Sequence, residues 1–122
     1  MFTILILEDD SVIRKVLAKR LAEKNNYLIF IEHAKCGYEV SRLNSIDLFI
    51  IDIGLPGNIN GIDFYKTIRG LSKYNETPAV ITSVDRDRLK LIKDDRHLAV
   101  VEKNGNSFIE EIRNIIEATS VE

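Results

Sequence analysis

Short apolar runs separated by amphipathic segments are the feature that most constrains how this chain can fold. Residues 2–7 form one such run, and residues 47–53 form another, bounded by turn-forming residues. Runs of this length suit β-strands buried on both faces and are too short for buried helices. Between them, apolar residues recur at spacings of three and four, which predicts amphipathic helices. Buried strands that alternate with helices predict a parallel sheet covered by helices on both faces.

The same patterns predict five strands and five helices in alternation, which is an α/β fold. The strands are expected at Phe2–Leu7, Leu28–Ile31, Asp47–Ile53, Ala79–Thr82 and Leu98–Val101. The helices are expected from Ser11 to about Lys24, from Gly37 to about Asn44, from Ile62 to about Ser72, at Arg86–Asp94, and from Ser107 to about Thr119. Because 122 residues leave no room for a second domain of ordinary size, we expect one domain over residues 1–122.

Composition excludes several classes of protein. The hydrophobic fraction of 45% and the charged fraction of 30% are typical of a soluble globular domain and not of a disordered chain. A net charge of −2 argues against a chain that wraps nucleic acid or coats a membrane. Cys36 is the single cysteine, which excludes an intramolecular disulfide and a thiolate zinc site and fits a reducing compartment. The apolar start meets Glu8 after seven residues, so it predicts neither a signal peptide nor a membrane span, and we expect a cytoplasmic protein.

Polar residues gather where the predicted strands end. In open α/β sheets, ligands bind at the carboxyl ends of the strands, near the point where the strand order reverses. The residues expected at this edge are Glu8, Asp9 and Asp10 after the first strand, Asp52 in the third, Thr82 and Ser83 after the fourth, and Glu102 and Lys103 after the fifth. Segments far apart in the sequence would therefore bring several acids, a hydroxyl and a lysine to one place.

These residue types have a definite chemistry. Clustered carboxylates repel one another, so they either raise a pKa or hold a cation, and oxygen ligands suit Mg²⁺. An ionised aspartate beside a lysine and a hydroxyl can serve as the nucleophile in phosphoryl transfer, which depends mainly on positioning and charge neutralisation. Acids at strand ends also cap the helix that follows, and we assign this role to Asp10, which precedes the predicted helix at Ser11.

Four segments, in their order and spacing, resemble the receiver domain of two-component response regulators. The segments are residues 5–14 with the acidic pair, 47–57 followed by Gly61, 78–83 ending in the hydroxyl, and 101–103 carrying the lysine. The resemblance covers essentially all 122 residues. It implies a flavodoxin-like doubly wound (βα)5 fold whose five-stranded parallel sheet has the order 2-1-3-4-5.

The resemblance also implies a role for each matching residue. Asp52 would accept a phosphoryl group from the phosphohistidine of a sensor histidine kinase or a phosphotransfer protein. Ser83 would donate a hydrogen bond to the phosphoryl oxygens, and Lys103 would pair with Asp52 and then with its phosphate. The remaining positions would hold Mg²⁺: Asp9 and Asp52 directly, together with the backbone carbonyl of Gly54, and Glu8 through metal-bound water. Phosphorylation would then change a partner-binding surface.

The sequence departs from the family pattern at three places. Asn104 follows Lys103 where the family has proline, and the loop at 57–60 is one residue longer than the common pattern. Val100 stands where the family often has an aromatic residue, so we expect the output change at the helix around Arg86–Asp94 and not at Val100 itself. The surface formed by the predicted fourth and fifth helices is also a candidate homodimer interface. Between the two hydroxyls, counting from Pro78 favours Ser83 over Thr82.

Two other functions compete with a phosphoacceptor receiver, which promotes only its own phosphorylation and dephosphorylation and is otherwise not an enzyme. The first is a receiver-like interaction module that is never phosphorylated. The second is a Mg²⁺-dependent phosphohydrolase, which is disfavoured because Gly54 stands where a second acid would be expected two residues after Asp52. The sequence identifies neither the cognate kinase nor the output partner.

Overall fold

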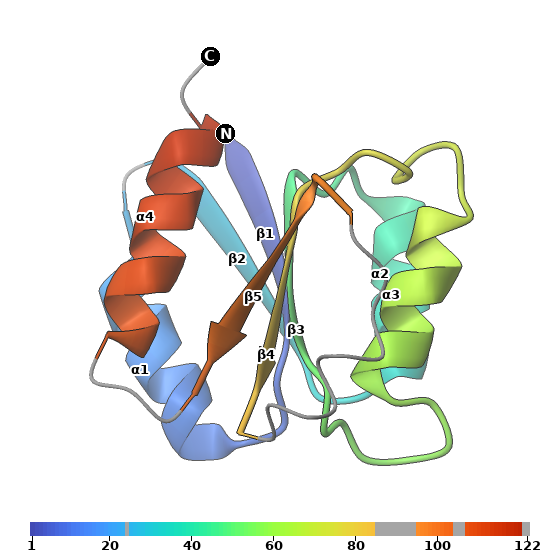
Figure 1. Ribbon diagram of the computed structural model, residues 1–122, viewed down its shortest axis with the longest axis horizontal. Coiled ribbons are helices and arrows are strands. Elements are labelled where there is room, and N and C mark those ends of the chain that lie inside the picture. The colour runs from blue at the N-terminus through green and yellow to red at the C-terminus, as the bar shows by residue number, and fades with distance from the viewer. Residues whose placement is uncertain (24, 85–94, 104–106, 121–122) are drawn as a thin grey trace.

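The computed structural model describes residues 1–23, 25–84, 95–103 and 107–120. Within these ranges the strands form one parallel sheet in the order β2-β1-β3-β4-β5, as predicted (Figure 1). The strands are β1 (Phe2–Leu7), β2 (Asn26–Ile31), β3 (Leu48–Asp52), β4 (Ala79–Ser83) and β5 (Leu98–Glu102). The order reverses beside β1, so the carboxyl ends of β1 and β3 lie next to each other at the switch point.

Helices cover both faces of the sheet, as Figure 1 shows. One face carries α1 (Ser11–Leu21) and α4 (Phe108–Ser120), and the other carries α2 (Ala34–Leu43) and α3 (Gly61–Arg69). The helix predicted at Arg86–Asp94 lies outside the described residues, and so does Asn104. None of the described helices has the length and apolar character that crossing a membrane requires.

Three of the predicted helix bounds are wrong by three residues, for local reasons. The first helix ends at Leu21, because the side-chain amide of Asn26 donates to the Leu21 carbonyl and Asn26 already belongs to β2. The second helix begins at Ala34 and not at Gly37, so Gly37 lies inside the helix. A Cβ at Gly37 would lie 2.8 Å from the Phe64 ring, so the absence of a side chain there lets α2 pack closely on α3.

The third helix ends at Arg69 and not at about Ser72. The backbone N–H of Gly70 donates to the carbonyls of Lys66 and Thr67, which closes the last turn of α3. The first strand matches its predicted bounds, and the other four differ from theirs by one or two residues at their ends. These shifts leave every predicted site residue at or just beyond a strand end.

Alternation along the strands divides the core into two layers. On the side of α2 and α3, the buried strand residues include Leu5, Leu7, Phe49, Ile51, Ala79 and Ile81. On the side of α1 and α4, they include Ile4, Ile6, Leu48, Ile50, Val80 and Val101. Glu8, Asp52 and Lys103 each stand two residues beyond a member of the second layer. Since side chains alternate between the two faces of a strand, these three polar residues continue the face that packs against α1 and α4.

The opposite edge of the sheet is held by what we call the amino-edge cluster, formed by Tyr65, Arg69 and Asp95. Arg69 Nε donates to Asp95 Oδ2 at 2.6 Å, and Tyr65 Oη donates to the same oxygen at 2.5 Å. The Arg69 guanidinium also donates to the carbonyls of Tyr74, Thr77 and His97. One side chain of α3 therefore ties down the segments that lead into β4 and β5.

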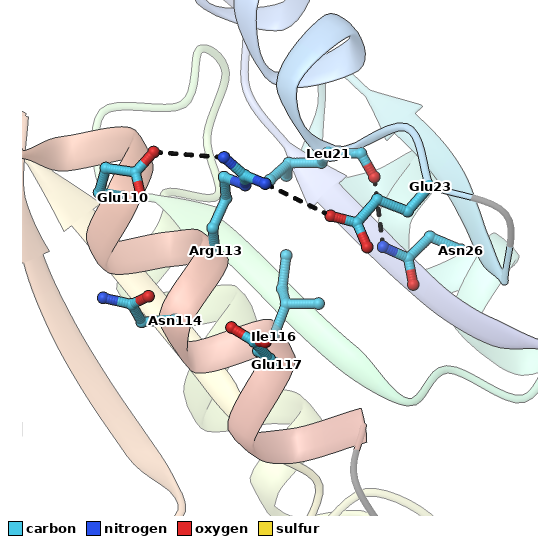
Figure 2. Close-up of a pocket in the computed structure, with 8 residues that line it drawn as sticks. All are labelled: Leu21, Glu23, Asn26, Glu110, Arg113, Asn114, Ile116 and Glu117. Carbon is cyan, nitrogen blue, oxygen red and sulfur yellow. Dashed lines mark hydrogen bonds and ion pairs between the residues drawn. The ribbon is translucent and has the colours of Figure 1, made fainter.

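A polar hollow of about 210 Å³ lies between the end of α1 and α4 (Figure 2). Arg113 of α4 spans it, contacting Glu110 at 3.3 Å on its own helix and Glu23 at 3.6 Å beyond α1. Arg20 of α1 adds an ion pair to Glu110 at 3.1 Å. Of these exposed pairs, Arg20–Glu110 joins α1 to α4, and none of the paired residues belongs to the predicted site.

Candidate functional site at the carboxyl edge of the sheet

Three predicted acids meet at the carboxyl edge. Glu8 and Asp9 follow β1, and Asp52 is the last residue of β3. Because Leu7 pairs with Ile51 in the parallel ladder, the chain positions that follow these two residues lie side by side. Glu8, Asp9 and Asp52 each offer a carboxylate oxygen within 4.8 Å of the others, and we call them the acidic cluster.

Lys103 supplies the positive charge of this site. Its side chain extends from the end of β5 and contacts Asp52 Oδ1 at 3.2 Å and Glu8 Oε1 at 2.6 Å. The ammonium group is held between two buried carboxylates, since the side chains of Glu8 and Asp52 are only 3% and 10% exposed. The predicted pairing of Lys103 with Asp52 is present, but Glu8 is the nearer partner.

Burial dominates the electrostatics of Glu8. Loss of solvent raises the pKa of this carboxyl to about 7, and the neighbouring charge of Asp52 adds to the rise, although the contact with Lys103 opposes it. One lysine therefore does not neutralise the acids around it. Because negative charge remains in excess, this site favours the binding of an added cation.

The loops around the acidic cluster are fixed by backbone hydrogen bonds. Asp10 caps α1, because its Oδ1 accepts from the N–H groups of Val12 and Ile13, as predicted. The N–H of Gly54 donates to Asp52 Oδ1 at 3.1 Å. This contact directs the Asp52 carboxylate toward the loop beyond the end of β3.

Both candidate hydroxyls are buried at the end of β4. Thr82 is the register partner of Asp52, whereas Ser83 stands one residue further along, opposite Glu102. The carbonyl of Ser83 accepts from the N–H of Lys103 at 3.1 Å, which links the ends of β4 and β5. Val100, the departure predicted to limit the switch, is exposed on β5.

Two features of this site were not expected from the sequence. Lys103 reaches Glu8 as well as Asp52, and the only signal for this was that both residues follow strands of the same sheet. Gly61, at the start of α3, lies against the backbone of Asp52. The sequence had matched Gly61 to the family pattern but gave no sign of this contact with Asp52.

The acidic cluster fits the divalent cation implied by the sequence. Its ligands are all oxygen atoms, they converge from two adjacent strands, and the charge around them favours a cation. Mg²⁺ prefers such ligands and keeps several of its waters. The residues that would hold it are Asp9 and Asp52, with Glu8 beside them.

Comparisons with known proteins agree with this geometry. The sequence profile of the response regulator receiver domain matches residues 4–109. Response regulator ArlR of Staphylococcus saprophyticus is 35% identical over 88 residues, a match that covers 71% of this chain and 38% of ArlR. The chain thus spans well under half the length of that relative.

Solved structures share the fold at low identity. Chemotaxis protein CheY4 of Vibrio cholerae superimposes with a TM-score of 0.82 at 18% identity, and the match covers 98% of both chains. The receiver domain of the sensor histidine kinase PA1611 from Pseudomonas aeruginosa, which has a magnesium ion coordinated in its active site cleft, superimposes with a TM-score of 0.79 at 17% identity over 96% of this chain and 95% of that one. The match of the family profile and the relative in S. saprophyticus show that this chain belongs to the receiver domains of two-component response regulators, and the solved structures share its fold. These are regulatory domains whose standard function is to accept a phosphoryl group.

Proposed function

We propose that Asp52 is the phosphoacceptor of this receiver domain and that its phosphorylation is Mg²⁺-dependent. The observation that carries the proposal is the convergence of Glu8, Asp9 and Asp52 within 4.8 Å, beside the buried ammonium group of Lys103. Within the acidic cluster, Asp52 is the member that ends a strand and contacts both Lys103 and the N–H of Gly54. These contacts hold one carboxylate oxygen and leave the other for attack.

In the proposed reaction, an Asp52 oxygen attacks the phosphorus atom of a phosphohistidine. The new O–P bond forms while the P–N bond breaks, and the bonding electrons return to the imidazole nitrogen. Lys103 then pairs with the phosphoryl group in place of the Asp52 carboxylate. Asp9, Asp52 and the carbonyl of Gly54, with Glu8 through a metal-bound water, would hold Mg²⁺, which would supply positive charge to neutralise the phosphoryl oxygens.

Ser83 is the hydroxyl that we assign to the phosphoryl oxygens. The Asp52 carboxylate is directed beyond its own strand end by Gly54, so a donor one residue past the register partner Thr82 is well placed. Replacement of Ser83 by alanine should uncouple phosphorylation from partner binding more than replacement of Thr82. The reverse ranking in a binding assay would transfer the assignment to Thr82.

The domain is regulatory, and we propose that it acts in the cytoplasm. Its phosphodonor would be a sensor histidine kinase or a phosphotransfer protein, and its output an effector domain or a separate partner. We assign the change of surface to the helix predicted at Arg86–Asp94, and the face of the fourth and fifth predicted helices could also serve a homodimer. Its chemistry would be limited to its own phosphorylation and dephosphorylation.

The test is chemical phosphorylation followed by intact-mass measurement. With Mg²⁺ and a small phosphodonor such as phosphoramidate, the chain should gain one phosphoryl group that hydroxylamine removes. Asp52→Asn should abolish the gain, and Asp9→Ala should reduce its rate strongly because a metal ligand is lost. Asp10→Asn is the matched control, since it removes a charge at the same edge while asparagine caps α1 equally well.

Three outcomes would contradict the proposal. Full labelling of Asp52→Asn would place the acceptor elsewhere. A wild-type chain that takes no label from phosphoramidate or from any histidine phosphodonor would favour the interaction module that is never phosphorylated. Continuous release of phosphate from small phosphate esters would instead favour a phosphohydrolase.

A further inference from the structure

Gly61 and the backbone of Asp52 make the closest approach at the carboxyl edge. A Cβ built on Gly61 would lie 2.1 Å from the Asp52 carbonyl oxygen, 2.8 Å from its carbonyl carbon and 2.9 Å from Cγ2 of Ile51. Real Cβ atoms essentially never come closer than 3.0 Å to another atom, so the shortest of these contacts is too close by nearly 1 Å. Two of the three atoms belong to the main chain, which cannot rotate away as a side chain can.

The start of α3 is itself firmly placed. The N–H of Gly61 donates to the Ile53 carbonyl at 3.1 Å. Asn60 and Asp63 form a reciprocal capping box, in which each side chain accepts from the backbone N–H of the other residue. Ile62, Phe64 and Ile68 of the same helix are buried. A side chain at position 61 would therefore push against Asp52 as much as against α3.

A side chain at position 61 would disturb the site mainly by moving the main chain of Asp52, and less by moving the start of α3. Its carboxylate is aligned by contacts of 3.1 Å to the N–H of Gly54 and 3.2 Å to Lys103. Movement of the Asp52 carbonyl by about 1 Å would rotate the carboxylate away from both partners. A misplacement of this size can lower a reaction rate by about a hundredfold.

We propose that Gly61 is a positioning residue for phosphoryl acceptance: its lack of a side chain lets α3 begin against the phosphoacceptor strand and sets the orientation of the Asp52 carboxylate. The inference rests on the proposed role of Asp52. Gly61 touches neither substrate nor metal, and it acts through the backbone of Asp52.

Gly61→Ala tests this inference, with Gly37→Ala as the matched control. A Cβ at Gly37 is also crowded, at 2.8 Å, but its nearest atoms belong to the side chains of Phe64 and Leu7, so the cost falls on core packing and not on the backbone of Asp52. Gly70→Ala is the mild control, because its nearest contact is 3.4 Å. All three are assayed with phosphoramidate and a series of Mg²⁺ concentrations, and their stabilities are compared by urea unfolding.

We expect Gly61→Ala to slow phosphorylation at least about tenfold and to raise the Mg²⁺ concentration that gives half the maximal rate. Gly37→Ala should lose stability, since its strain lies in the core. Once fully folded, it should keep the phosphorylation rate and the half-maximal Mg²⁺ concentration within about twofold of wild type. Sucrose or trimethylamine N-oxide in every assay keeps the destabilised variants folded. This pattern would support the inference, because a loss of stability alone would affect Gly61→Ala and Gly37→Ala alike.

Equal rates for Gly61→Ala and Gly37→Ala would overturn the inference while leaving the role of Asp52 intact. A Gly61→Ala chain that stays unfolded in the stabilising solutes would also overturn it, since the glycine would then serve the fold as a whole. Failure of the proposed function is distinguishable from both outcomes. In that case the wild-type chain itself would take no label, or Asp52→Asn would take as much as wild type.

Discussion

The two edges of the sheet are built on opposite electrostatic principles. At the amino edge, Arg69 faces one carboxylate and three backbone carbonyls, so donors and acceptors match. At the carboxyl edge, the acidic cluster has three carboxylates, and the ammonium group of Lys103 contacts two of them. The first arrangement stabilises the fold without further partners, whereas the second stores a repulsion that a cation relieves.

The pKa of one carboxyl group at each edge is shifted, and the two shifts have opposite directions. Burial of Asp95 raises its pKa, but hydrogen bonds from Tyr65, Arg69 and the N–H of His97 outweigh that effect and lower it to about 2. Burial of Glu8 raises its pKa to about 7 in spite of Lys103. A carboxylate at the amino edge thus stabilises the folded state when ionised, and one at the carboxyl edge destabilises it. We infer that stability is concentrated at one end of the strands and reactivity at the other.

The largest effect is expected from Arg69→Met. Removal of the guanidinium leaves Asp95 without its cation and three carbonyls without their donor, so we expect a loss of about 3 kcal/mol in the free energy of unfolding. Arg42→Met is the control, because its pair with Glu39 is exposed and should contribute less than about 0.5 kcal/mol. Equilibrium unfolding in urea measures both. A loss below about 1 kcal/mol for Arg69→Met would contradict the claim that the amino-edge cluster stabilises the fold.

The next effect concerns Glu8 in metal-free solution. Its folded pKa of about 7 lies above the ordinary value of 4.5, so the folded state binds a proton that the unfolded chain releases. The resulting stabilisation is fully present below 4.5 and is lost as the pH rises through about 7. In EDTA, the urea midpoint should therefore rise as the pH is lowered from about 8 to about 5. Glu8→Gln should remove this rise, and an identical pH dependence in both chains would show that Glu8 is not perturbed.

Asp95 should show the opposite dependence in a more acidic range. Because its folded pKa of about 2 lies below the ordinary value of 3.8, its stabilisation is present above 3.8 and is lost as the pH falls through about 2. The expected contribution is about 2 kcal/mol, since one pKa unit corresponds to about 1.4 kcal/mol. The difference in stability between wild type and Asp95→Asn should shrink over this range. A constant difference would mean that the carboxylate is not paired with Arg69.

The smallest effect is expected from Asp52→Asn without metal. Asparagine removes a charge that repels Glu8, while its carbonyl oxygen still accepts from Gly54 and Lys103 keeps its nearer partner. We expect a gain of about 1 kcal/mol, or roughly 4 °C in the melting temperature measured in EDTA. Saturating Mg²⁺ should cancel the gain, since metal relieves the same repulsion in the wild-type chain. A lower melting temperature in EDTA would indicate that the contacts of Asp52 outweigh its repulsion.

Much of this architecture was predictable from local patterns. The buried runs at 2–7 and 47–53 indicated strands of a parallel sheet, and the carboxyl ends of parallel strands necessarily meet at one edge. Glu8, Asp9, Asp52 and Lys103 could therefore be assigned to one site before any contact was known. The capping role of Asp10 was equally local, since it depends on the backbone N–H groups of Val12 and Ile13. The order of the strands came from the resemblance to receiver domains and not from periodicity.

Helix bounds were less predictable because they depend on contacts outside the helix. Periodicity extends through a segment until some group satisfies the last carbonyl or the next element begins. Asn26 and Gly70 supply these endings for α1 and α3. For α2, the packing of Gly37 against Phe64 decided that a glycine belongs inside a helix.

The sequence by itself determined which residue types reach each edge of the sheet, because strand periodicity and strand ends are local properties. Only the tertiary structure decided their partners. Arg69 pairs with Asp95 across 26 residues, and Lys103 lies nearer to Glu8 than to Asp52, because the order and register of the strands and the reach of each side chain set these distances. The raised pKa of Glu8 was decided in the same way, since a pKa depends on burial and on neighbours that exist only in the folded chain.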